Sequence, residues 1–334
     1  DGLAGLQSVW TLLGVVAYVA TLVVVGRSRD LARYRYTFLL IGVVLLLLPL
    51  LPGVGNQIRG ARIWVSIGPI GFQPGEFAKI ALAIFFAGYL VERRELLKEW
   101  ALNLKVLGPV LLAWAVSLVV MTAERDLGSS LLFFGLFVIV LWVATGRALY
   151  LVGGGGLFAA GALFAWSTFN HVQERVDIWL DPWADAGGDG FQVVQAWFAL
   201  AWGGVGGTGL GLGNPERIPV VETDFIFAAI GEELGLFGTT AIIVSFLLMI
   251  GTGLRIAVRA EDNFDKLLAT GLTTLLGLQA FIIMGGVTRL LPLTGVTLPF
   301  VSYGGSSLLG NYVLLALLVR ISDDTARRRG EIAP

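Results

Sequence analysis

Long apolar runs separated by short polar segments make up most of this chain. A helix needs about 20 mainly apolar residues to cross the hydrocarbon core of a bilayer, and runs of roughly that length recur along the sequence. The pattern predicts nine spans, at residues 6–26, 36–53, 76–91, 106–123, 128–145, 149–168, 225–252, 266–288 and 302–320. We therefore predict an all-α fold, a polytopic helical membrane bundle that forms a single transmembrane domain over residues 1–334.

Basic residues in the short loops indicate how this bundle is oriented. Lys and Arg accumulate in short loops that face the cytoplasm. Loops on one predicted side carry most of the 23 Lys and Arg residues, including Arg27 to Arg35, Arg93 to Lys105, Arg255 to Lys266 and Arg327 to Arg329. We expect that side to be cytoplasmic, so that the N-terminus lies outside and the C-terminus inside.

Residues 169–224 form the longest segment between predicted spans, and the orientation makes them an extracytoplasmic loop. The loop contains four of the ten Trp residues, at positions 179, 183, 197 and 202, and Trp is enriched at membrane–water interfaces. The stretch Phe191 to Trp202 is apolar but too short to span, which predicts a helix lying in the interface. Long structured loops on one face often carry function.

Composition supports the membrane assignment and argues against several kinds of site. Hydrophobic residues make up 56% of the chain and charged residues 14%, whereas a soluble domain carries about 25% charged residues. The chain has no Cys and a single His, His171, which argues against disulfides, thiolate or histidine metal sites and a Ser-His-Asp triad. A net charge of −1 creates no field that would attract nucleic acid.

Asp224 is the leading catalytic candidate because it stands where the long loop becomes a span. The residues after it are apolar up to Ile230, and a carboxylate partly withdrawn from water is a better general base. An equally weighted alternative is that Thr223 or Asp224 caps the following helix. Glu232 and Glu233 lie about two turns deeper, and we interpret them as a buried structural hydrogen-bonding pair.

A second group of charged residues surrounds the start of the span at 76–91. Glu76 and Lys79 are three residues apart, so they share one helix face. They form either a local ion pair that eases insertion or a site in which Lys79, with Arg59 or Arg62, neutralises a phosphate or pyrophosphate. Asp126 is interpreted more simply, as the N-cap of the next span.

A third candidate region runs from Gly285 to Asn311, where prolines and glycines flank polar residues. Such interrupted backbone is tolerated at membrane depth only where it lines a cavity or is buried in protein. Arg289 is either an anion ligand there or a side chain that snorkels to the interface. The run Gly203 to Gly213 lacks the ending of a P-loop, which favours close packing or turns. The substrate-binding candidates are Arg59, Arg62, Glu76, Lys79, Arg175, Gln195, Arg289 and Ser302.

Nine short segments lie in order over nearly the whole chain: R-G-A-R-I-W at 59–64, F-Q-P-G-E-F-A-K at 72–79, D-L-G at 126–128, D-P-W at 181–183, the glycine run at 203–213, T-D-F-I-F-A at 223–228, E-E-L-G at 232–235, L-P-L-T-G at 291–295 and S-Y-G-G-S-S at 302–307. Together, and in this order, they resemble the SEDS family (shape, elongation, division and sporulation) of peptidoglycan polymerases. The form of the L-P-L-T-G segment is similar to the cell-elongation type.

The resemblance implies a fold and a reaction. The family has ten spans, and the nine predicted here correspond to its second to tenth. Its substrate is lipid II, and its essential aspartate falls on Asp224, which would deprotonate the acceptor hydroxyl. The α-linkage becomes β-1,4, so the transfer inverts without a covalent intermediate. Cationic side chains, or a divalent cation (Mg or Mn) bound with the substrate, would stabilise the leaving pyrophosphate, with no tightly bound cofactor.

The resemblance also implies a location and partners. The family lies in the bacterial cytoplasmic membrane, in contact with membrane lipids, and acts on lipid II and on glycan linked to undecaprenyl pyrophosphate. It works with a class B penicillin-binding protein, which is a transpeptidase.

The main alternative function is a flippase that moves the lipid-linked precursor across the membrane. Such a transporter also places charged residues in a membrane cavity, but it favours internal repeats and sites on both faces. We find no convincing repeat, and the candidate groups lie on the outer side. A non-catalytic scaffold is a third interpretation, which leaves Asp224 without a role.

Overall fold

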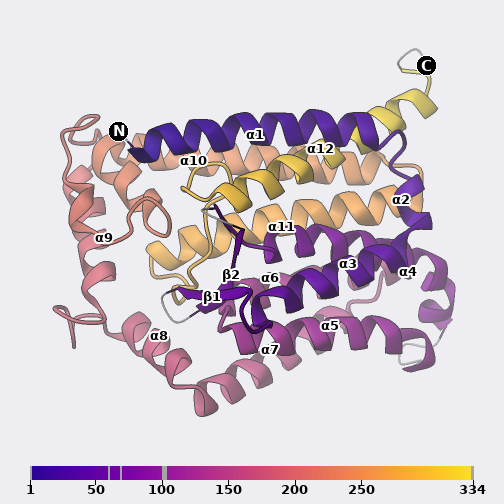
Figure 1. The fold of residues 1–334 in the computed structure, drawn as a ribbon, viewed down its shortest axis with the longest axis horizontal. Helices are drawn as coiled ribbons and strands as arrows, with labels where there is room; N and C mark the ends of the chain where they lie inside the picture. Colours follow the sequence, from indigo (N-terminus) through magenta and orange to yellow (C-terminus); the bar gives the residue numbers. More distant parts are fainter. Residues whose placement is uncertain (1, 59–60, 68–69, 100–103, 332–334) are drawn as a thin grey trace. The chain divides into compact units, whose positions relative to one another are not determined.

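The computed structural model describes residues 2–58, 61–67, 70–99 and 104–331. Each of the nine predicted spans overlaps a helix (Figure 1). These helices are α1 (Gly2–Val24), α3 (Arg35–Leu47), α4 (Gly75–Glu99), α5 (Leu104–Glu124), α6 (Leu127–Thr145), α7 (Leu149–Thr168), α10 (Ile226–Arg259), α11 (Asn263–Val287) and α12 (Gly305–Arg328). By length and composition, six helices of the described chain can cross a membrane, namely α1, α6, α7, α10, α11 and α12. The chain is therefore a mostly helical membrane bundle, while the number nine stays a prediction.

Several shorter helices complete the fold. They are α2 (Asp30–Arg33), α8 (Asn170–Leu180), α9 (Phe191–Gly203) and the 3-10 turns η1 (Leu48–Leu50) and η2 (Pro215–Arg217). The helix predicted at Phe191 to Trp202 is confirmed as α9; its place in the membrane interface stays a prediction. The sequence pattern did not predict α8, because its polar residues interrupt the apolar run.

A small antiparallel sheet corrects the expectation of an all-α fold. Strands β1 (Gly55–Ile58), β2 (Ala61–Ile67) and β3 (Ile70–Phe72) pair in the order β1-β2-β3. The predicted span at 36–53 ends early, because α3 gives way to η1, whose Pro49 cannot donate a helical hydrogen bond. A Cβ at Gly55 would lie 1.7 Å from the Pro49 carbonyl oxygen, so only glycine allows β1 to turn this closely over η1.

The described chain divides into two compact units. The first comprises Asp1–Gly154, Ile250–Leu276 and Gly305–Pro334. Its core lies along α4, where Phe85 and Phe86 are fully buried. Phe86 packs against Phe137 of α6, with ring centroids 5.7 Å apart. Within this unit α1 lies beside α12 (Figure 1).

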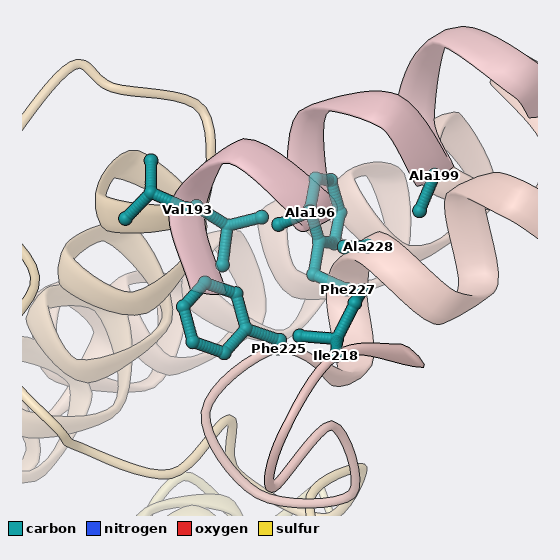
Figure 2. Close-up of a cluster of buried hydrophobic side chains, with 8 residues drawn as sticks. Val193, Ala196, Ala199, Ile218, Phe225, Phe227 and Ala228 are labelled. Carbon is teal, nitrogen blue, oxygen red and sulfur yellow. The ribbon is translucent and has the colours of Figure 1, made fainter. Parts of the chain in front are cut away.

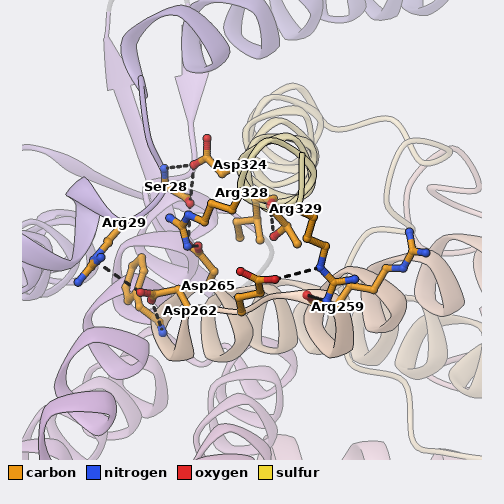
Figure 3. Close-up of polar contacts among 12 residues, drawn as sticks. Ser28, Arg29, Arg259, Asp262, Asp265, Asp324, Arg328 and Arg329 are labelled. Carbon is orange, nitrogen blue, oxygen red and sulfur yellow. Dashed lines mark hydrogen bonds and ion pairs between the residues drawn. The ribbon is translucent and has the colours of Figure 1, made fainter. Parts of the chain in front are cut away.

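Polar contacts tie together the basic-rich ends of the helices in the first unit (Figure 3). The Ser28 hydroxyl lies 2.6 Å from Asp265 and 2.8 Å from Asp324, and both carboxylates are buried. Arg328 forms an ion pair with Asp265 at 3.2 Å. Buried carboxylates require such partners, because an unpaired buried charge is costly. The network joins the segment after α1 to α11 and α12.

The second unit comprises Gly155–Met249 and Gly277–Gly304. Its core is a cluster of buried apolar side chains between α9, the start of α10 and the end of α11 (Figure 2). The small residues Ala196 and Ala199 of α9 let that helix pack closely, and Phe225 and Phe227 fill the space beside them. This packing holds in place the turn that leads into α10.

The glycine run 203–213 packs against α10, which confirms the expected role in close packing and turns. A Cβ at Gly203 would lie 1.9 Å from the carbonyl oxygen of Gly231, and one at Gly207 would lie 2.1 Å from that of Glu233. Glu232 has a structural role, since its buried carboxylate accepts a hydrogen bond from the Asn214 amide at 2.9 Å.

Candidate functional site

Asp224 stands in the second unit, at the turn that leads into α10. The helix begins two residues later at Ile226, and Phe225 between them is buried in the apolar cluster of Figure 2. Burial of Phe225 fixes the turn, while Asp224 itself is half-buried. The carboxylate therefore has a fixed position at the start of an apolar helix, and its role as a general base stays a prediction.

Ser302 joins the proline- and glycine-rich segment to the Asp224 turn. Its hydroxyl donates to the Thr223 carbonyl oxygen at 2.6 Å and accepts from the Leu298 amide at 2.8 Å. The hydroxyl proton and one lone pair of Ser302 are therefore used in hydrogen bonds with the backbone. Ser302 thus positions the residue before Asp224, and direct contact of Ser302 with substrate stays a prediction.

Gly295, the last residue of L-P-L-T-G, borders the Asp224 carboxylate. Its φ of +73° lies in the left-handed region that favours glycine. A Cβ built on Gly295 would lie 3.9 Å from Oδ2 of Asp224. Gln279 of α11 supports the same segment, because its side-chain amide donates to the Thr297 carbonyl oxygen at 2.9 Å. Neither Gly295 nor Gln279 was among the site residues predicted from the sequence, and the glycine within L-P-L-T-G was the available signal.

Arg175 and Arg289 fasten α8 to this segment. Arg175 donates to the Leu293 carbonyl oxygen at 2.8 Å. Arg289 donates to the carbonyl oxygens of Trp179 and Leu180 at the end of α8, and the Trp179 indole donates to the Arg289 carbonyl oxygen at 3.1 Å. A cation is favourable there, because the last carbonyls of a helix lack helical partners and carry partial negative charge.

The second unit therefore brings together four of the predicted residues around one segment: Asp224, Arg175, Arg289 and Ser302. The guanidinium of Arg289 also lies 5.3 Å from the ring centroid of Trp197 on α9. Gln195 is half-buried on the same helix, beside the core residue Ala196. A role in substrate binding stays a prediction for all of the binding candidates.

Glu76 and Lys79 form an ion pair in the first unit. Lys79 Nζ lies 2.9 Å from both carboxylate oxygens of Glu76, and the two side chains are 6% and 5% exposed. Pairing is required at this burial, because a lone charge would lose its hydration without compensation. The ion-pair interpretation is confirmed, and contact between Lys79 and a pyrophosphate stays a prediction.

Asp126 lies in the turn between α5 and α6, and its predicted role as a helix N-cap is confirmed. Its carboxylate accepts from the Ser129 amide at 2.9 Å. Burial raises the pKa of the Asp126 carboxyl, and hydrogen bonds from Ser129 oppose the rise. The positive charge of Lys79 lowers this pKa, and the negative charge of Glu76 raises it. The D-L-G segment thus lies within electrostatic reach of the Glu76–Lys79 pair.

The structure describes one of the two predicted arginines before α4. Arg62 is half-buried on β2 in the first unit, and Arg59 lies outside the described residues. In the part of the chain that the structure describes, no three Asp, Glu or His side chains are grouped to hold a metal ion.

A search of protein families matches residues 3–327 of this chain to the family described as "Cell cycle protein", FTSW_RODA_SPOVE. The chain is also similar to "Peptidoglycan glycosyltransferase RodA" of Mycobacterium tuberculosis (strain ATCC 25618 / H37Rv). The two are 48% identical over 97% of this chain and 71% of the relative.

Two solved structures share the fold. One is a chain of "Structural coordination of polymerization and crosslinking by a peptidoglycan synthase complex", with a TM-score of 0.82 and 29% identity over 97% of this chain and 90% of that chain. The other is the Thermus thermophilus rod shape determining protein RodA, with a TM-score of 0.68 and 27% identity over 95% of this chain and 86% of that chain.

Proposed function

We propose a mechanism for this chain, which belongs to the cell cycle protein family of FtsW, RodA and SpoVE. The chain is a multi-pass membrane peptidoglycan glycosyltransferase. It polymerises lipid II into glycan strands during cell elongation. We place the reaction at the extracytoplasmic face of the bacterial cytoplasmic membrane, with the C-terminus in the cytoplasm. The observation that supports a specific mechanism is the fixed position of Asp224, between the buried Phe225 and the backbone of Gly295.

Asp224 acts as the general base. It takes the proton from the sugar hydroxyl of the acceptor, and the oxygen attacks the anomeric carbon of the donor sugar. A carbon–oxygen bond forms on one face of the sugar while the bond to the pyrophosphate oxygen breaks on the other, so the configuration inverts. A positioned base of this kind contributes about 10²–10⁴-fold to the rate.

Cationic side chains stabilise the charge that develops on the leaving pyrophosphate. The candidates are Arg59, Arg62, Lys79, Arg175 and Arg289. Glu76 holds Lys79 in place, and the end of α8 holds Arg289 in place. Each cation therefore has a fixed position, but some of its N–H groups already donate to the protein. A divalent cation that arrives with the pyrophosphate stays a prediction, and no step here depends on one.

A class B penicillin-binding protein is the proposed partner. The similarity to a chain of a peptidoglycan synthase complex, in which polymerisation and crosslinking are coordinated, supports a partnership with a transpeptidase. Glycan strands made by this chain would pass to that transpeptidase for crosslinking.

A polymerisation assay on the purified full chain tests the base directly. Asp224→Asn keeps the shape of the side chain and its capping oxygen but removes the basicity. We expect polymerisation of lipid II to fall by about 10²–10⁴-fold, with thermal stability unchanged. The matched control is Glu222→Gln, which removes a carboxylate two residues away in the same turn and should polymerise at the parent rate.

An Asp224→Asn protein that polymerises at the parent rate would exclude Asp224 as the base and leave it as a helix cap. A parent chain that moves lipid II across vesicle membranes but makes no polymer would favour the flippase function instead.

A further inference from the structure

A small cavity lies between the basic-rich ends of α10 and α12, within the first unit. Its volume is about 160 Å³. The last two turns of α10 form one wall, and the end of α12 with the residues after it forms the other. Its polar lining includes Arg255, Arg259, Ser322, Thr325, Arg329 and Glu331.

The charge in this cavity is unbalanced. Three arginines line it against the single carboxylate of Glu331. Arg329 is engaged elsewhere, because its guanidinium lies 3.3 Å from Glu261 and donates to the Arg259 carbonyl oxygen at 2.8 Å (Figure 3). The guanidinium groups of Arg255 and Arg259 have no ion-pair partner among the residues that the structure describes.

Arg255 and Arg259 are four residues apart, so they lie on one face of α10, where like charges repel. An anion between them relieves that repulsion, and guanidinium groups bind phosphate oxygens through paired hydrogen bonds. Ser322, on the facing helix, adds a hydroxyl that can donate to the same group. The cavity thus has the chemistry of a phosphate site.

Exposed apolar side chains beside the cavity favour a lipid as the source of that phosphate. Leu254 and Val258 alternate with the two arginines on α10 and are 46% and 79% exposed. Apolar side chains this exposed, at the end of a helix long and apolar enough to cross a membrane, suit contact with acyl chains. Basic pockets between the ends of membrane helices on the cytoplasmic side bind anionic headgroups.

We propose that the cavity between α10 and α12 binds the phosphate headgroup of an anionic phospholipid, with Arg255 and Arg259 as its ligands. The lipid comes from the leaflet on the basic-rich side, which the proposed orientation makes cytoplasmic. The site is separate from the residues assigned to glycosyl transfer, so its occupancy can be measured without the reaction.

Native mass spectrometry of the full chain in neutral detergent tests this site. The parent should bind dioleoylphosphatidylglycerol more tightly than dioleoylphosphatidylcholine. Arg255→Gln/Arg259→Gln removes both ligand charges and should weaken phosphatidylglycerol binding at least about tenfold, since the loss of even one charge-assisted hydrogen bond weakens binding by about that factor. Arg255→Lys/Arg259→Lys keeps both charges and should retain most of the binding.

The matched control is Arg27→Gln/Arg33→Gln, which removes two exposed arginines from the same side of the bundle but outside the cavity. It should bind phosphatidylglycerol like the parent. Equal weakening in the control and cavity variants would overturn the proposal, because binding would then follow total surface charge. Inorganic phosphate that binds as tightly as phosphatidylglycerol would overturn it as well, because the occupant would then be a free anion.

Discussion

At the scale of single residues, the Glu76–Lys79 pair shows why charged side chains persist inside an apolar helix. The two side chains are only 6% and 5% exposed, so each charge needs compensation from nearby groups, and the two lie 2.9 Å apart. A buried pair of this kind adds little net stability over apolar residues, but loss of one partner leaves an uncompensated charge. The pair therefore restricts the sequence of α4 whether or not Lys79 also contacts a pyrophosphate.

Glu76→Gln is expected to lower the free energy of unfolding by up to about 3–5 kcal/mol, because the buried Lys79 loses a counter-charge that lies 2.9 Å away. The exchange Glu76→Lys/Lys79→Glu should recover part of that loss. Removing the exposed pair partner in Glu95→Gln, beside Arg94, should cost less than about 1 kcal/mol. Thermal unfolding of the purified variants measures stability, and lipid II polymerisation measures function.

Recovery of both stability and polymerisation in the exchange variant would mean that the pair acts only through its mutual attraction. Recovery of stability without polymerisation would mean that Lys79 must occupy its own position, as a pyrophosphate ligand requires. Parent-like stability of Glu76→Gln would contradict the argument from burial.

At the scale of elements, the apolar runs determine the helices, because burial or lipid contact requires a continuous apolar length. The span was predicted to continue to residue 53, but α3 ends at Leu47 and the segment with Pro49 forms a 3-10 turn instead. α8 depends on contacts made far along the chain by Arg175 and Arg289. A local sequence pattern does not predict contacts between residues that are far apart along the chain.

The candidate site, like the fold, was predictable in its local features and not in its long-range contacts. Asp224 stood out because it is a carboxylate at the edge of an apolar run. The backbone contacts of Ser302 and the position of Gly295 beside Asp224 were not predictable, because they join segments about 70 to 80 residues apart by hydrogen bonds and close packing.

The anchoring of α8 gives a prediction at this scale. Arg289→Gln removes the guanidinium that holds the last carbonyls of the helix, and one hydrogen bond to a charged group contributes about 1.5–3 kcal/mol. We expect amide hydrogen exchange across residues 170–180 to become at least about tenfold faster. The control Arg217→Gln removes an exposed arginine of η2 in the same unit and should leave exchange in α8 unchanged.

If α8 exchanges at the parent rate in Arg289→Gln while polymerisation falls, Arg289 acts on the substrate rather than on the helix. If exchange rises and polymerisation falls together, Arg289 acts as a positioning residue through α8.

At the scale of the whole molecule, the proposed orientation in the membrane rests on the distribution of charge. The basic residues lie mainly in the segments that join the helices at one side of the bundle, and moving them across a bilayer is unfavourable. The polar network around Ser28 lies among these segments, at the ends of α11 and α12. Both the proposed extracytoplasmic reaction and the proposed lipid site depend on this orientation.

Single-cysteine labelling tests the orientation, and the chain has no native Cys to interfere. Asp30→Cys lies at the start of α2 among the basic residues, and Asp189→Cys lies in the exposed segment between α8 and α9. In intact cells a membrane-impermeant maleimide should label Asp189→Cys and leave Asp30→Cys unlabelled. After the membrane is permeabilised both should react, which controls for burial of either thiol. The reverse pattern in intact cells would place Asp224 and its surrounding segment on the cytoplasmic side, where strands could not be handed to an extracytoplasmic transpeptidase.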